Sequence, residues 1–325
     1  MLSDAAVSGN WFTLKSGPNK GNGNFMSMMQ KFNTSKSWQI QYSIFDQAEG
    51  PAILFFHGFP GSHVQAEFLR PYAAAQGVLV IAVDRPGYGG TTALPSGTPS
   101  VREYAQGVIE LLESLHIRRF HVLGVSGGAP LSWLLSSWYP DRVQALGIVC
   151  GLCSYGADEY QLFSRLQKSA LLLRRGLPEG LLHFLVKKIM QRMPPQRLIN
   201  TLKKFVAEED QKLLVQPRMQ ELLLSSMTMA RAQGPAGLLW DVYLYGSDWL
   251  GESANVKALS SLPIFLWHGA KDNILPYQMS QLMQSKFPQA VLKIYPDMAH
   301  YSLPIFKAEE ILHQFTRPKS IDDTL

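Results

Sequence analysis

One serine in the sequence stands in a setting that favours nucleophilic chemistry. Residues 124–128 read Gly-Val-Ser-Gly-Gly, at the end of an apolar stretch and at the start of a helical pattern. A strand that turns sharply into a helix strains the backbone of the turn residue, and its neighbours must then lack side-chain bulk. The pattern predicts Ser126 as a nucleophile at a helix N-terminus, with the amide of Gly127 offered to a developing oxyanion. The alternative is that Ser126 only caps the helix.

A neutral serine needs a base within hydrogen-bond reach, and the sequence offers eight histidines. Where a serine occupies such a turn, the acid and then the base follow it along the chain. His300 falls in a loop after the last predicted strand, and we predict that it is the base. Asp272 follows the preceding strand and is predicted to hold the imidazole in the required tautomer. Asp297 is the rival acid, only three residues before His300.

A second oxyanion donor is expected from the loop after an earlier apolar stretch. Residues 57–62 read His-Gly-Phe-Pro-Gly-Ser and follow such a stretch directly. Gly58 lets the chain swing its next amide toward the serine, so we predict the N–H of Phe59 as the donor. His57 lies at the end of a predicted strand, and we interpret it as a structural residue that braces the loop.

Alternating strand and helix patterns set these residues at one edge of a sheet. Apolar runs of strand length alternate with helical patterns, which is typical of parallel strands joined by right-handed crossovers. Ser100 and Glu103 read as a capping box at one helix start. The fold class predicted is α/β, with a mostly parallel, doubly wound sheet. The strands are expected at 39–45, 52–56, 78–83, 122–125, 264–267 and 291–295, and the helices at 63–76, 100–115, 128–139, 276–286 and 306–315.

The middle of the chain breaks this alternation. Residues 155–249 show helical periodicity punctuated by prolines, which predicts an all-helical cap inserted between two strands of the sheet. Residues 36–154 and 250–325 then form the core. Residues 1–35 are rich in glycine and asparagine and are read as an irregular extension, with one short strand considered at 11–14.

Composition narrows the class of protein. The 325 residues are 46% hydrophobic and 17% charged, as in ordered globular proteins. We expect no signal peptide and no spanning segment, because the start of the chain lacks an apolar core of secretory length and no apolar run reaches the ~18 residues that a span needs. We expect a cytoplasmic location, because the only cysteines, Cys150 and Cys153, cannot make a disulfide framework. Their C-x-x-C spacing leaves a redox role open, although we interpret them as buried small side chains.

The net charge of +5 lies entirely in residues 155–247, which hold 13 lysines and arginines against 8 acidic residues. No nucleic-acid-binding motif accompanies it, so we expect no nucleic-acid partner. The basic helical stretch 181–192, with Lys187, Lys188 and Arg192, could touch an anionic membrane. Short cap helices are often amphipathic, however, so membrane contact is not expected. The sequence indicates no metal or organic cofactor, and it leaves the oligomeric state open.

From residue 39 onward the chain resembles the α/β-hydrolase superfamily. The resemblance rests on residues 57–62, on Asp-Arg-Pro-Gly-Tyr-Gly-Gly at 84–90, on 124–130, on 267–276 and on 297–300. It implies a serine hydrolase of the esterase-like group, without a metal or cofactor, in which Asp84 pins its glycine-rich loop. Epoxide hydrolases and haloalkane dehalogenases of the superfamily carry aspartate where this chain has Ser126. Proline-specific peptidases carry glycine where it has Phe59, and Ala299 replaces the glycine that often precedes the base.

These expectations combine into one mechanism: acyl transfer from an ester-like, small and apolar substrate to water. The leucines and methionines of the helical segment could line an apolar site, or they could pack against the core. Two alternatives stay open: a C–C bond hydrolase or cofactor-free perhydrolase or lyase with the same residues, and a non-catalytic receptor for a small molecule.

Overall fold

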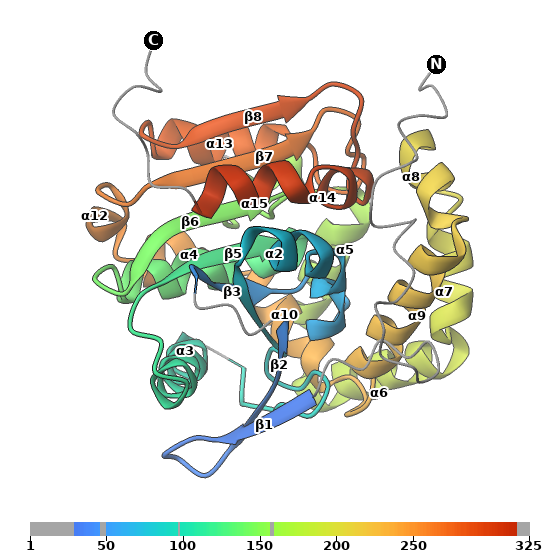
Figure 1. The fold of residues 1–325 in the computed structure, drawn as a ribbon. Coiled ribbons are helices and arrows are strands. Elements are labelled where there is room, and N and C mark those ends of the chain that lie inside the picture. The colour runs from blue at the N-terminus through green and yellow to red at the C-terminus, as the bar shows by residue number, and fades with distance from the viewer. Residues whose placement is uncertain (1–28, 46–49, 97, 157–158, 317–325) are drawn as a thin grey trace, which may run out of the picture.

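An eight-stranded sheet forms the centre of the protein in the computed structural model, which describes residues 29–45, 50–96, 98–156 and 159–316 (Figure 1). The strand order is β1-β2-β4-β3-β5-β6-β7-β8, and every pair from β4 onward is parallel. The strands are β1 (Met29–Asn33), β2 (Gln39–Phe45), β3 (Ala52–Phe56), β4 (Leu79–Val83), β5 (Phe120–Val125), β6 (Val143–Val149), β7 (Ile264–Gly269) and β8 (Val291–Tyr295).

The central strands form where the sequence carries unbroken apolar runs. Every residue of β3 and β5 is buried, as expected for strands covered on both faces. The predicted α/β class and mostly parallel sheet are therefore confirmed. The prediction of an irregular extension over 1–35 was wrong for Met29–Asn33, which pairs with β2 as an antiparallel edge strand. This strand is polar and half exposed, so no apolar run marks it. The segment 11–14 lies outside the described residues.

Helices cover both faces of the sheet. Buried residues of α3, α4 and α13 pack on one face, and those of α2 and α15 pack on the other. These elements are η2 (His63–Phe68), α2 (Arg70–Gln76), α3 (Thr98–Ser114), η3 (Ser126–Gly128), α4 (Ala129–Trp138), α13 (Gln278–Lys286), α14 (Ser302–Phe306) and α15 (Ala308–Thr316).

Two helix predictions needed correction. The helix expected from Ser100 already begins at Thr98, so Ser100 lies within its first turn and the proposed capping box is wrong. The single helix expected at 63–76 is divided into η2 and α2. The helix expected at 306–315 is preceded by the short helix α14. Helix ends of this kind depend on tertiary packing that local sequence does not record.

A run of helices separates β6 from β7, and we call residues 159–259 the helical insertion. No strand occurs among the described residues of this segment. Its elements are η4 (Glu159–Leu162), α5 (Arg165–Gly176), α6 (Glu179–Arg192), α7 (Pro195–Leu202), α8 (Glu208–Leu214), α9 (Pro217–Ala230), α10 (Ala236–Tyr245), α11 (Trp249–Ser253) and α12 (Val256–Leu259).

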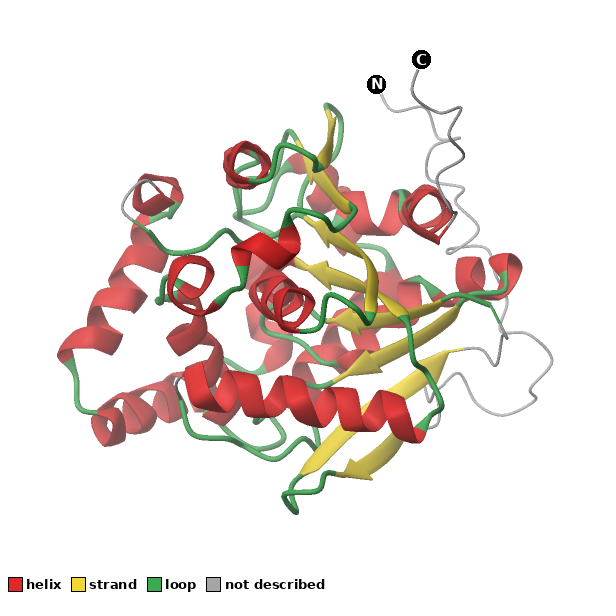
Figure 2. Cartoon of the chain, turned by 90° about the vertical axis from the view of Figure 1, so that its left-hand side faces the viewer, coloured by secondary structure: helices red, strands yellow, loops and turns green. Residues whose placement is uncertain are grey.

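The helical insertion stands over one edge of the sheet. In Figure 2 the strand arrows point toward a group of helices beyond their carboxyl ends. Hydrogen bonds place the insertion there, since Tyr245 of α10 contacts the turn after β5 and Asp210 of α8 contacts the loop after β8. Loops at the carboxyl edge of a parallel sheet commonly build binding sites. Among the described helices, none has both the length and the apolar character to cross a membrane.

Candidate active site

Ser126 stands at the sharp turn between β5 and the helix formed by η3 and α4. Its φ angle is 54°, in the left-handed region that an L-residue rarely adopts. A side chain at position 124 would collide with Ser132, and one at position 128 would collide with the backbone of Phe56 and His57. The strained turn expected from the glycine spacing is therefore present, and the two glycines are what allow it.

His300 connects the serine to a carboxylate. Its Nε2 lies 2.9 Å from Ser126 Oγ, and its Nδ1 lies 2.7 Å from Asp272 Oδ2. Since an ionised carboxylate only accepts hydrogen bonds, Nδ1 carries the proton and Nε2 is free to accept the one on the serine hydroxyl. The structure thus brings together the three side chains singled out from the sequence, and all three are buried.

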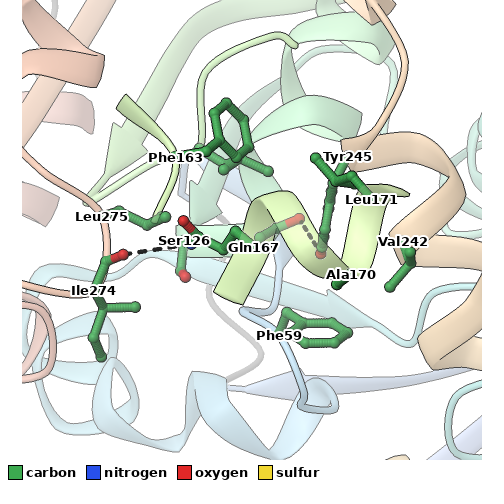
Figure 3. Close-up of a pocket in the computed structure, with 12 residues that line it drawn as sticks. Phe59, Ser126, Phe163, Gln167, Ala170, Leu171, Val242, Tyr245, Ile274 and Leu275 are labelled. Carbon is green, nitrogen blue, oxygen red and sulfur yellow. Dashed lines mark hydrogen bonds between the residues drawn. The ribbon is translucent and has the colours of Figure 1, made fainter. Parts of the chain in front are cut away.

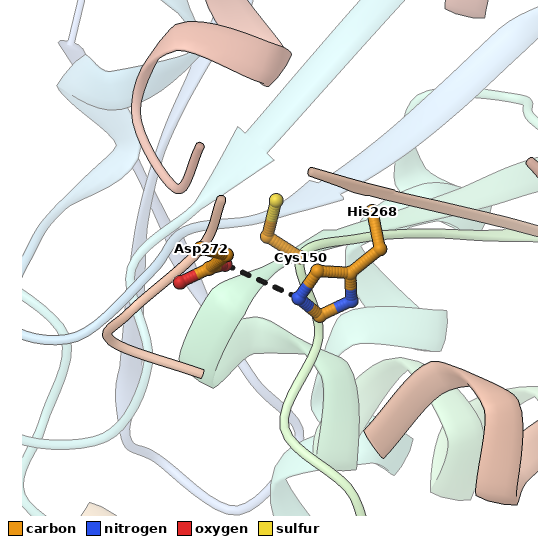
Figure 4. A group of neighbouring side chains, drawn as sticks. All are labelled: Cys150, His268 and Asp272. Atoms are coloured by element: carbon orange, nitrogen blue, oxygen red, sulfur yellow. Dashed lines mark hydrogen bonds and ion pairs between the residues drawn. The ribbon is translucent and has the colours of Figure 1, made fainter. Parts of the chain in front are cut away.

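Four donors hold the carboxylate of Asp272. Oδ1 accepts the amides of Ile274 and Leu275, each at 2.9 Å, while Oδ2 accepts from His300 and, at 3.2 Å, from Nε2 of His268. The N–H of His268 is shared with the carbonyl oxygen of Leu275, at 2.9 Å. Figure 4 shows His268 aimed at Asp272 from β7. Burial raises the pKa of this carboxyl, but the attraction of His300 and the hydrogen bonds of both imidazoles outweigh burial and hold it well below its usual range.

The imidazole of His300 has a raised pKa. Burial disfavours its charged form, but the negative charge and the hydrogen bond of Asp272 more than offset this cost, and Asp210 adds to the effect. A base with a raised pKa accepts a proton more readily. The arrangement is therefore electrostatically suited to remove a proton from Ser126.

The other acidic and imidazole side chains considered from the sequence lie outside the hydrogen-bond chain of Ser126, His300 and Asp272. Asp297 has a side chain 67% exposed and faces Lys271 at 3.8 Å, so it does not stand behind the imidazole. His57 is buried and accepts the amide of Arg85, as expected for a residue that braces its loop. Asp84 accepts the amide of His63 at 2.6 Å and its ring Nδ1 at 2.9 Å, so it ties two loops together.

Phe59 and Gly127 flank Ser126, as the sequence led us to expect. Both line the same cavity as the serine, and a Cβ built on Gly127 would lie 2.8 Å from Cβ of Phe59. The hydroxyl of Tyr245 donates to the carbonyl oxygen of Gly127 at 2.9 Å, and its ring meets that of Phe59 edge to face. The helical insertion thereby reaches the peptide that follows the serine.

Two apolar cavities meet at Ser126. The larger, of about 190 Å³, lies between the serine and the helical insertion, and Figure 3 shows Ile274 and Leu275 on one side of it with Val242 and Tyr245 on the other. The smaller, of about 60 Å³, is bounded by His300 and by apolar residues of α9, among them Met219, Leu222, Leu223 and Met227. Some methionines of the insertion thus do line a site, as considered from the sequence.

Three further contacts join the helical insertion to the loops of this site, and the sequence analysis missed them. Asp210 accepts the amides of Tyr301 and Ser302, directly after His300. Ser226 accepts the amide of Ser62 at 3.0 Å, in the loop that carries Phe59. No spacing rule could have found these partners, because they lie more than 90 residues apart in sequence.

The third contact is a fully buried ion pair between Arg85 and Asp241 of α10. Arg85 Nη2 lies 2.5 Å and Nε 3.0 Å from the two carboxylate oxygens, and Tyr88 donates to the same carboxylate at 2.6 Å. Arg85 also donates to the carbonyl of His57. A bidentate pair of this kind fixes the orientation of both partners. It therefore ties α10 to the loop that follows β4 and, through the carbonyl of His57, to the loop that follows β3.

Cys150 lies beside Asp272 and His268, at the end of β6. It is buried with a φ angle of 47°, and burial raises the pKa of its thiol well above the usual range. Its sulfur, an imidazole nitrogen of His268 and an oxygen of Asp272 lie within 4.8 Å of one another. Asp272 is already held by four donors, and the thiol is protonated. Both cysteines are buried, as expected for small core side chains, and neither forms a disulfide.

A buried serine, imidazole and carboxylate joined by hydrogen bonds at the carboxyl edge of a parallel sheet are the arrangement of a hydrolase. The polypeptide belongs to the alpha/beta hydrolase fold family, whose model matches residues 51–305. This confirms the family suggested by the resemblance.

Similar proteins include hydrolases of more than one kind. Over 98 residues, 30% of this chain, it is 35% identical to "Epoxide hydrolase 2" of Siraitia grosvenorii, and the match spans about a third (31%) of that relative's length. The fold is similar to that of the esterase EaEST from Exiguobacterium antarcticum (TM-score 0.65, 14% identity, 88% of this chain and 97% of that one). It is also similar to a bromoperoxidase from Bacillus anthracis (TM-score 0.63, 20% identity, 88% and 98%).

Proposed function

We propose that this protein is a serine esterase that cleaves an ester-like bond of a small, apolar substrate through an acyl-enzyme. In this proposal Ser126 is the nucleophile, His300 the general base and Asp272 the acid that orients it. The amides of Phe59 and Gly127 form the oxyanion hole, and the helical insertion is the cap that covers the substrate.

The observation that carries the proposal is the continuous hydrogen-bond chain from Ser126 through His300 to Asp272. Its two distances, 2.9 and 2.7 Å, are those of a nucleophile within reach of its base and of a base held by its partner. The carboxylate stays ionised and the pKa of the imidazole is raised. A serine that merely capped the helix would need neither partner.

The reaction then follows acyl transfer. Ser126 Oγ attacks the carbonyl carbon while His300 Nε2 takes its proton, and the negative charge that develops on the carbonyl oxygen is stabilised by the two backbone amides. His300 next gives the proton to the departing alcohol. Water, deprotonated by the same imidazole, then attacks the acyl-enzyme and releases Ser126.

The two cavities suggest where each half of the substrate binds. The leaving alcohol must receive its proton from His300, which bounds the smaller cavity of about 60 Å³. We therefore place a short alcohol there and the acyl group in the larger cavity of about 190 Å³, where the apolar lining favours a hydrocarbon chain or ring.

Elementary chemistry separates this proposal from epoxide opening, the activity named for several relatives. A serine oxygen that opened an epoxide would form an ether, which has no carbonyl that water could attack, so the enzyme would not be regenerated. A carboxylate nucleophile forms an ester that water can cleave. Ser126 therefore favours a carbonyl substrate for this chain.

The test is labelling with a fluorophosphonate probe, together with an assay of the hydrolysis of a series of methyl esters. Hydrolysis is monitored by the protons that the product acid releases. Wild-type protein should label and turn over, and Ser126→Ala should do neither. Ser136→Ala is the matched control, because this buried hydroxyl of α4 has no hydrogen-bond partner among the residues that the structure describes. Both activities should survive in it.

Absence of labelling and of ester turnover in the folded wild type would refute the proposal and leave the receptor alternative. Labelling with turnover only of β-diketones would instead favour a C–C bond hydrolase. Styrene oxide should give no diol. The two cysteines, neither of which forms a disulfide, support a reducing compartment such as the cytoplasm for this activity.

A further inference from the structure

Helices α5 and α6 of the helical insertion expose an unusual number of apolar side chains. In α6 these are Leu181, Phe184, Leu185 and Ile189, and in α5 they are Leu172 and Leu173, each between 39% and 60% exposed. Helices usually bury the apolar face that such spacing creates. The stretch 181–192 was read from the sequence as an amphipathic helix, and the structure turns its apolar side outward.

Cations share this outward face. Residues 181, 184, 185, 188 and 192 recur every three or four positions along α6, so Lys188 and Arg192 stand on the same side as the apolar residues. The ammonium of Lys188 lies 5.6 Å from the ring centre of Phe184. Only Met190, on the opposite side, is buried. The helix thus presents aliphatic and aromatic groups with lysine and arginine beside them.

The charge of this region is strongly one-sided. Residues 165–204 contain ten lysines and arginines and one acidic residue, Glu179. Within the part of the chain that the structure describes, no carboxylate forms an ion pair with Lys187, Lys188 or Arg192. The positive potential of the surface is therefore not neutralised locally.

We propose that the outward face of α5 and α6 docks on an anionic lipid bilayer. Apolar side chains entering the headgroup region, flanked by cations that contact lipid phosphates, are the combination that holds an amphipathic helix at a membrane surface. From the sequence a membrane contact of this helix was considered and not favoured, because short cap helices are often amphipathic. The exposure of that side is the new observation.

Charge complementarity favours an anionic bilayer over a second copy of the protein or a nucleic acid as the partner of this face. Two copies of the protein would bring like-charged faces together, which costs free energy. A nucleic acid would attract the cations, but its solvated phosphate backbone would give the aliphatic side chains of Leu181, Leu185 and Ile189 nothing to pack against. An anionic bilayer satisfies both the cations and the apolar groups.

Docking through this face would set the active-site cavity next to the membrane. The opposite side of α5 contributes Gln167, Ala170 and Leu171 to the larger cavity beside Ser126. One helix therefore separates the lipid surface from that cavity. The docking does not depend on the esterase proposal, because binding is measured without turnover.

The test is co-sedimentation of the full chain with vesicles of phosphatidylcholine and phosphatidylserine in a roughly 2:1 mixture. Wild type and Ser126→Ala should both bind, and binding should weaken at high salt and on phosphatidylcholine alone. Replacing Lys188 and Arg192 by glutamine should lower the partition constant about 30-fold. Replacing Leu181, Phe184 and Ile189 by serine should lower it at least about tenfold.

Matched controls remove equally exposed groups from outside α5 and α6. Val256→Ser with Val291→Ser, and Lys257→Gln with Lys36→Gln, should leave binding unchanged. Equal losses in these controls, or no binding of wild type to the anionic vesicles, would overturn the proposal. A dimer in solution that the α6 serine variant dissociates, without vesicle binding, would overturn it too and assign the face to a second copy.

Discussion

Replacing Asp210 by asparagine should weaken catalysis although this residue does not touch Ser126. Its two carboxylate oxygens accept the amides of Ser302 at 2.8 Å and of Tyr301 at 3.1 Å, and so hold the two residues that follow His300. Asparagine has the same shape but only one acceptor oxygen. Its NH₂ group would face a backbone N–H, so one charge-assisted hydrogen bond would be lost.

The size of the effect follows from these contacts. Loss of one hydrogen bond to a buried carboxylate costs about 1.5–3 kcal/mol of stability. If the loop relaxes by a fraction of an ångström, His300 no longer lies in line with the serine hydroxyl, and kcat/KM should fall about tenfold to a hundredfold. The variant also loses a negative charge that helps to raise the pKa of His300.

The pH profile of kcat/KM distinguishes this reasoning from a general loss of stability. Protonated His300 cannot act as a base, so activity falls as the pH drops through the imidazole pKa. In wild type, burial opposes protonation but Asp272 outweighs it, which places the midpoint above the ordinary imidazole value of about 6.5. In Asp210→Asn the midpoint should move to lower pH.

Glu209→Gln is the matched control. It removes the same charge from the same helix, but Glu209 pairs with Lys271 at the surface and does not contact the histidine loop. Its profile should coincide with that of wild type. An Asp210→Asn profile with an unchanged midpoint, or an equal shift in Glu209→Gln, would refute the view that Asp210 acts on the base.

Three other substitutions probe the site. Asp272→Asn should lower kcat by about 10³–10⁴-fold in the esterase assay with little change in KM, because the amide no longer fixes the imidazole tautomer; a loss below tenfold would contradict the assignment. Asp241→Ala should lower the free energy of unfolding, measured with a chemical denaturant, by about 3–5 kcal/mol, since it leaves the guanidinium of Arg85 buried and unpaired. The double replacement Asp241→Leu with Arg85→Met should lower it much less. Equal losses would argue against a buried pair. Gly127→Ala should abolish turnover while the protein stays folded by circular dichroism, because the added methyl group would meet the hydroxyl of Tyr245; full activity would show that the two groups are not in contact in solution.

The sequence was most informative where backbone geometry dictates residue type. The glycines around Ser126 are required by the sharp turn itself, so their spacing predicted both the strand end and the strained serine. Unbroken apolar runs marked the buried parallel strands for a similar local reason. His300 and Asp272 could be placed because each follows a strand whose end lies at the same sheet edge.

The residues that were missed act across long sequence separations. Asp210, Asp241 and Tyr245 lie in helices whose local pattern says only that they are helical, and their partners belong to distant loops. The edge strand β1 was missed because it is held by backbone pairing with β2 rather than by an apolar face. The second imidazole on Asp272 was missed although His268 stands only four residues before it.

The four hydrogen bonds on Asp272 have a consequence for the number of protons that move. Every acceptor position of that carboxylate is occupied, by two backbone amides and two ring nitrogens. An anion so fully solvated by fixed dipoles has little to gain from protonation, and its pKa is low. In the proposed mechanism the proton on Nδ1 of His300 therefore stays there while Nε2 accepts the one from Ser126. Each proposed step then transfers a single proton, and the carboxylate serves as a permanent counter-charge to a transient imidazolium.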